Sequence, residues 1–100
     1  TLFISEYINN LYAKNISFIT LDKDAFDLSN QLKEILINEY KVEKEIFLSL
    51  NLENVKSPSK DDCLLLLTSF KSTKFNDIKT FYSKLQILGW KLSGFIFIDN

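Results

Sequence analysis

The sequence contains no His, no Arg and no Met, and it holds a single Cys. Because His is absent, the usual proton shuttle and the commonest nitrogen ligand for zinc are missing. Because Arg is absent, nothing in the chain can clamp a phosphate or a carboxylate with a planar, forked donor. Little is left for acid–base or nucleophilic chemistry, and we expect no catalytic activity from this chain alone.

The charged residues show no clustering by sign. The basic residues are 12 lysines scattered among 13 acidic residues, for a net charge of −1. Proteins that bind nucleic acid usually carry a clustered basic stripe. We therefore expect no nucleic-acid partner.

The chain also lacks the signals of a membrane or secreted protein. No apolar run approaches the roughly 20 residues that a helix needs to cross a bilayer. The first stretch, Thr1 to Leu11, contains Glu6 and no basic residue, unlike a signal peptide. The lone Cys63 offers no disulfide framework and opens a run of Leu, which is typical of a small core residue. We expect a cytoplasmic domain with no direct membrane span.

The sequence contains enough apolar residues to form the core of one folded domain. Hydrophobic residues make up 46% of the 100 residues, so the chain is far from a disordered composition. We interpret residues 1–100 as a single domain, and the missing initiator Met predicts that it is a fragment of a longer chain. Helical spacing of apolar residues predicts helices at 2–13, 24–40 and 75–88. Strands are predicted at 16–21, 44–53, 63–70 and 92–98.

This order of elements, α-β-α-β-loop-β-α-β, predicts an α/β fold with a mostly parallel sheet and helices packed on it. One link leaves an alternative open. The loop 54–62 holds the only Pro, Pro58, and is barely long enough for a parallel crossover. If strands 46–51 and 63–70 pair antiparallel instead, the fold is the α+β ferredoxin-like βαββαβ arrangement.

Asp22 and Asp24 are the candidate metal ligands. They follow a predicted strand, at the carboxyl end where open α/β sheets bind ligands, and two carboxylates there could hold Mg²⁺. In the alternative interpretation Asp24 caps the following helix and Asp22 shapes the turn. Lys71 to Lys74 form a second polar turn, which could contact an anion or simply begin a helix. The two glycines, Gly89 and Gly94, cannot supply a phosphate-binding glycine motif.

Two stretches resemble a known family. Phe18 to Asp24 reads as a hydrophobic strand closing in Asp-x-Asp, and Asp62 to Ile98 reads as a strand, a polar turn, a helix and a Gly-containing strand. Together they resemble the cytoplasmic P-loop ATPase and tyrosine-kinase-like domains of capsular and exopolysaccharide biosynthesis, the chain-length-regulator family. The resemblance implies a domain of polysaccharide assembly that contacts sister subunits or a membrane-anchored partner.

The sequence departs from that family at the residues that perform catalysis. The phosphate loop would lie before Thr1, and Phe26 stands where the resemblance implies an Arg. No Asp is present near Leu50 and Asn51, where a third acidic motif is expected. Mg-ATP is thus an expected cofactor only if an upstream phosphate loop exists. We expect a degenerate or partial domain that acts by protein–protein contacts. The alternative is a ferredoxin-like binding or regulatory module without nucleotide function.

Overall fold

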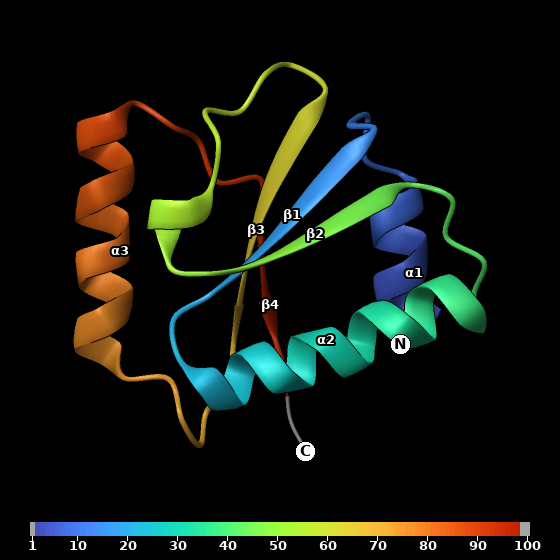
Figure 1. Ribbon diagram of the computed structural model, residues 1–100, viewed down its shortest axis with the longest axis horizontal. Coiled ribbons are helices and arrows are strands. Elements are labelled where there is room, and N and C mark those ends of the chain that lie inside the picture. The colour runs from blue at the N-terminus through green and yellow to red at the C-terminus, as the bar shows by residue number, and fades with distance from the viewer. Residues whose placement is uncertain (1, 99–100) are drawn as a thin grey trace.

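Residues 2–98 form four strands and three α-helices, which alternate along the chain except that only a 3-10 turn separates the second strand from the third (Figure 1). The structure is a computed structural model, which describes residues 2–98. Its elements are α1 (Leu2–Asn9), β1 (Asn15–Thr20), α2 (Lys23–Asn38), β2 (Glu45–Leu50), the 3-10 turn η1 (Leu52–Asn54), β3 (Asp62–Thr68), α3 (Phe75–Leu88) and β4 (Gly94–Phe97). Within residues 2–98, no helix combines the length and the apolar character needed to cross a membrane.

The four strands form one parallel sheet in the order β2-β1-β3-β4. Ile16 in β1 lies opposite Ile46 of β2 on one side and opposite Cys63 of β3 on the other. The predicted parallel α/β fold is therefore confirmed. The ferredoxin-like alternative is wrong, because it needs antiparallel pairing between the second and third strands. The link between these strands leaves β2 at Asn51, whose φ is positive at 68°, and passes through η1 before crossing the sheet.

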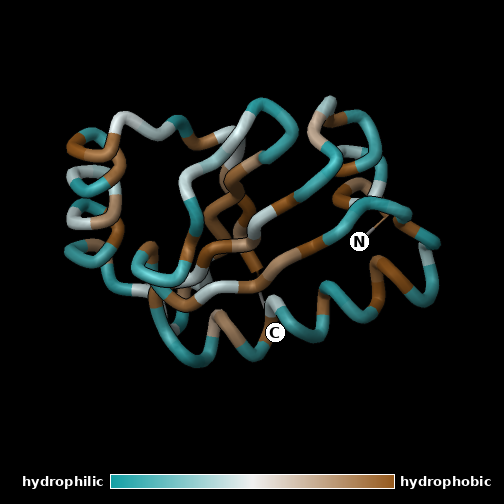
Figure 2. The backbone as a smooth tube through the Cα atoms, turned by 45° about the horizontal axis from the view of Figure 1, so that its top comes forward, coloured by the Kyte–Doolittle hydropathy of each residue, from teal (hydrophilic) through white to brown (hydrophobic). Residues whose placement is uncertain are grey.

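Each face of the sheet has its own hydrophobic core. One face packs against α1 and α2, with Phe18 and Leu65 fully buried among Ile8 and Leu36 from the helices. The other face packs against α3, with Leu64 and Leu66 alternating onto Phe81 and Leu85. Figure 2 shows the result: hydrophobic segments run through the central strands, while the helices alternate between hydrophobic and hydrophilic residues. Cys63 is buried, as predicted.

The helix ends correct two details of the sequence interpretation. The N-cap of α2 is Asp22, not Asp24, because Asp22 keeps the extended backbone of the preceding strand while Asp24 is already helical. The first helix ends at Asn9 and does not reach Ala13. The end of α3 agrees with prediction, since Gly89 adopts the left-handed conformation with a φ of 71°.

Candidate functional site

The strand order creates one point where ligands usually bind an open α/β sheet. The chain leaves β1 through α2 toward β2, whereas β3 lies on the opposite side of β1. The carboxyl ends of β1 and β3 therefore flank a topological switch point. Asp22 follows β1 there, and the loop from Ser69 to Lys74 follows β3. The sequence-predicted acidic residues do lie at the position expected for a ligand site.

The Asp22 carboxylate at this point is used by the protein itself. Its Oδ1 accepts a hydrogen bond of 2.9 Å from the backbone N–H of Ala25, which caps α2. Its Oδ2 accepts a hydrogen bond of 2.6 Å from the Thr73 hydroxyl. The same hydroxyl oxygen accepts a bond of 3.0 Å from the backbone N–H of Ser69. These bonds join the ends of β1 and β3 across the switch point.

The surroundings of Asp22 favour its ionised form. Partial burial, the largest single influence, would raise the pKa of this carboxyl, but the hydrogen bonds it accepts, first from Thr73 and then from Ala25, together outweigh burial and lower the pKa. The Ser72 hydroxyl also favours the lowered pKa, although its oxygen is buried without a hydrogen bond of ordinary geometry. Asp22 is thus a charged cap held by donors of its own chain.

Asp24 lies in a different environment. It sits in the first turn of α2, exposed, and lines a cavity of about 200 Å³ together with Asp27, Ser69 and Lys71. Asp22 does not line that cavity. Among residues 2–98, no three or more His, Cys, Asp or Glu side chains come together as a group that could hold a metal ion. The structure does not bring the two predicted ligands onto one cavity, and the Mg²⁺ site stays a prediction.

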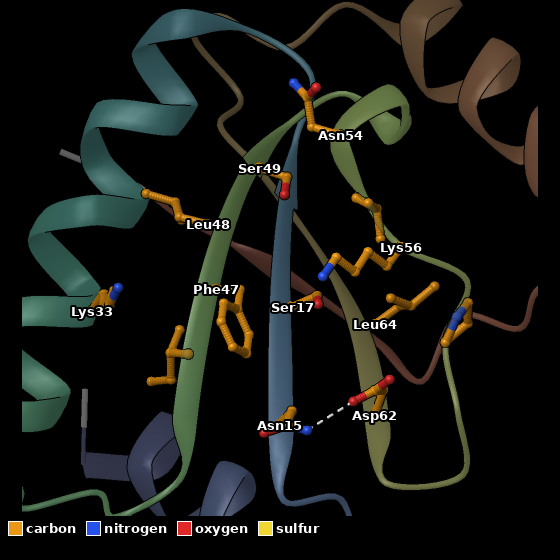
Figure 3. Close-up of a pocket in the computed structure, with 13 residues that line it drawn as sticks. Asn15, Ser17, Lys33, Phe47, Leu48, Ser49, Asn54, Lys56, Asp62 and Leu64 are labelled. Atoms are coloured by element: carbon orange, nitrogen blue, oxygen red, sulfur yellow. Dashed lines mark hydrogen bonds between the residues drawn. The ribbon is translucent and has the colours of Figure 1, made fainter.

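A larger cavity lies on the sheet itself, on the face that carries α3. The link between β2 and β3 contains only η1, so no helix covers the part of this face over β2 and β1. The resulting sheet-face groove encloses about 590 Å³, within the range of small-ligand pockets. Figure 3 shows its lining, which includes Ser17, Phe47, Ser49, Lys56, Asp62 and Leu64.

The chemistry of the sheet-face groove suits binding better than catalysis. Asp62 accepts hydrogen bonds from the Asn15 amide and from the backbone N–H and hydroxyl of Ser59. The bond from the Ser59 N–H, followed by that from Asn15, lowers the pKa of Asp62. The carboxylate is therefore a poor proton acceptor for the Ser17 hydroxyl. Lys56 reaches over the groove toward β1 (Figure 3) and forms no ion pair with any acidic side chain of residues 2–98.

The sequence interpretation missed this groove. Residues 48–53 alternate between apolar and polar, as in a strand with one polar face, and Ser49 of this segment lines the groove. The second signal was the absence of any helical period in residues 54–62. Neither signal gives the strand order, so the uncovered part of the sheet face became apparent only in the tertiary structure.

Comparisons with family models, with curated proteins and with solved structures found no match to this chain. Support for a function therefore comes from the residues and the fold described above.

Proposed function

We propose that this chain is a degenerate or partial P-loop-ATPase-like domain of polysaccharide assembly, located in the cytoplasm, which acts by protein–protein contacts rather than by catalysis. The observation that carries the non-catalytic role is the hydrogen bond from Thr73 to Asp22. Both oxygens of the Asp22 carboxylate thus accept hydrogen bonds from the chain's own groups, which gives this carboxylate a structural role that needs no metal. The all-parallel sheet supports this ancestry over a ferredoxin-like module.

Exposed apolar side chains support a role in protein contacts. Phe3 on α1 is 83% exposed, and Tyr7 lies one turn further along the same helix. Large exposed aromatic side chains are typical of surfaces that bind another protein. A membrane-anchored subunit or a sister subunit fits this proposal.

Deleting the gene and complementing it with variants tests the proposal in the cell that encodes the protein. We expect deletion to change the amount or chain length of the surface polysaccharide. Asp24→Asn should restore the wild-type polysaccharide, because Asp24 is exposed and no nucleotide chemistry depends on it. An unchanged polysaccharide after deletion contradicts the role in assembly. Failure of Asp24→Asn to complement, with Mg²⁺-dependent ATP hydrolysis by the wild type, contradicts the non-catalytic role.

A second candidate function is the binding of a small anionic molecule in the sheet-face groove. Lys56 favours it, because its ammonium group extends over the groove without an acidic partner among the described residues. Benzoate titrated into labelled protein and followed by NMR would test it, since Phe47 offers an aromatic wall. Shifts at Ser17 and Ser49 that disappear in Lys56→Ala are expected. Shifts that survive this substitution contradict the role of Lys56.

A further inference from the structure

The outer edge of β4 has hydrogen-bonding groups that the sheet does not use. The backbone N–H of Ile98 donates to the Thr68 carbonyl at 2.7 Å, and Phe97 lies opposite Thr68 in the register. In a parallel pair, alternate residues direct their backbone groups to the neighbouring strand. The backbone N–H and C=O groups of Gly94 and Ile96 therefore point toward β3. Those of Phe95 and Phe97 point away from β3, to the open edge of the sheet. Such an edge is a template for one more strand.

The side chains of the same two residues belong to an exposed aromatic edge cluster, formed by Phe70, Phe75, Phe95 and Phe97. The rings of Phe70 and Phe97 stack with centroids 4.6 Å apart, and those of Phe95 and Phe97 lie 4.7 Å apart. Phe70 and Phe75 are each 71% exposed and Phe97 is 54% exposed. All four rings line one cavity of about 390 Å³ between β4 and the start of α3. A contiguous apolar surface of this kind marks an interaction site.

Two lysines flank Phe75 of the aromatic edge cluster. Lys74 precedes this ring in the sequence and Lys79 follows it by one helical turn, whereas Lys71 lies with Asp24 and Asp27 on a separate cavity. The Lys79 ammonium lies 5.6 Å from the centroid of the Phe75 ring, so one positive charge is held at the rim of the cluster. An acidic partner is attracted to the positive charge at this rim.

We propose that the β4 edge and the aromatic edge cluster bind an extended, acidic segment of a partner protein. The segment adds to the sheet as a strand, pairing with the backbone groups of Phe95 and Phe97. Its apolar side chains, at alternate positions, enter the aromatic cavity, and acidic residues that flank the paired stretch lie beside Lys74 and Lys79. This inference rests on the proposed function in one respect, that the domain works by protein contacts, and it names the surface and the chemistry of the partner.

A synthetic peptide tests the inference: about six residues, the usual length of one strand, alternate Ile and Ser, and a Glu flanks them at each end. Fluorescence anisotropy of the labelled peptide measures its binding to the whole chain. Phe97→Glu should weaken binding about tenfold or more, because it removes an aromatic anchor and adds a repelling charge. Phe47→Glu is the matched control. Phe47 is also a Phe in an edge strand and is 51% exposed, but it lies on β2. It should leave binding unchanged.

Two altered peptides separate strand addition from simple apolar adsorption. A peptide with alternate backbone nitrogens methylated keeps the side chains but loses donors, and it should not bind. A peptide with Lys in place of Glu should bind more weakly than the acidic one, and Lys74→Glu together with Lys79→Glu should reverse that order. Equal binding of the methylated peptide, or equal binding to wild type and Phe97→Glu, overturns the inference. So does a dimer in sedimentation that Phe97→Glu abolishes, because the occupant is then a second copy.

The peptide-binding experiment and the gene-deletion experiment can contradict their two hypotheses independently. If the acidic peptide binds at β4 but gene deletion leaves the polysaccharide unchanged, the strand site stands and the role in polysaccharide assembly is wrong. If deletion changes the polysaccharide but Phe97→Glu binds the peptide as wild type does, the role stands and the contact surface lies elsewhere.

Discussion

Asp22→Ala is the substitution that most directly tests the interpretation of the switch point. It removes the cap of α2 and the bond that links the ends of β1 and β3. Loss of an N-cap costs about 1 kcal/mol, and loss of a hydrogen bond to a charged group costs about 1.5 kcal/mol or more. We expect the free energy of unfolding to fall by about 2–3 kcal/mol. For a domain of this size, the melting temperature should fall by roughly 10–20 °C.

Urea denaturation followed by circular dichroism measures this change, with Asp24→Ala as the control. Asp24 also lies at the positive end of the α2 dipole, but it makes no hydrogen bond within residues 2–98 through its side chain. Its replacement should cost less than about 1 kcal/mol. A double-mutant cycle with Thr73→Val then isolates the link between the two strand ends. Equal costs for Asp22→Ala and Asp24→Ala, or zero coupling to Thr73, would refute the structural role of Asp22.

The pH dependence gives an independent check on the same carboxylate. The pKa of Asp22 in the folded protein lies below its ordinary value of 3.8, so its ionised form stabilises the fold. This contribution is fully present above the ordinary value and is lost as the pH falls through the lower folded pKa. The stability difference between wild type and Asp22→Ala should therefore be constant near neutral pH and shrink below 3.8. A difference that grows on acidification contradicts the sign of the pKa shift.

Three further substitutions test the packing. Gly94→Ala should destabilise the fold by about 1–3 kcal/mol, because the added methyl group would clash with the Tyr7 hydroxyl oxygen; Tyr7→Phe in the same chain should recover part of this loss, and thermal denaturation measures both. Gly89→Ala should lower the free energy of unfolding, measured by urea denaturation, by about 1 kcal/mol. The cause is backbone strain, because a residue with a Cβ disfavours the left-handed conformation at this position, whereas no atom lies close enough to clash with the added methyl group. Leu65→Ala, at a fully buried position, should cost about 2–5 kcal/mol, and a loss below about 1 kcal/mol would contradict the close packing of the core on the α1 and α2 face.

The candidate site shows how far residue patterns reach. The sequence placed Asp22 and Asp24 at the end of a strand, because a hydrophobic run followed by acidic residues is a local pattern. It could not distinguish which of the two carboxylates caps α2, since that depends on the residue at which the backbone changes from extended to helical. Nor could it pair Asp22 with Thr73, which lies 51 residues further along the chain. The contact exists only because β1 and β3 are neighbours in the sheet.

The aromatic residues show the same division. Phe18 and Phe97 both lie in predicted strands, and nothing in the local sequence separates them, yet Phe18 is fully buried and Phe97 is 54% exposed. The difference is set by strand order: β1 is central and covered, whereas β4 is at an edge.

The sequence by itself determined the succession of helices and strands, the burial of Cys63 and the end of α3 at Gly89, because hydrophobic period and backbone preference act over a few residues. Only the tertiary structure decided that β2 and β3 both pair parallel to β1, that a groove remains open beside η1, and that the β4 edge carries an uncovered aromatic cluster. These features follow from contacts between residues far apart in the chain, whose free energy no local pattern contains.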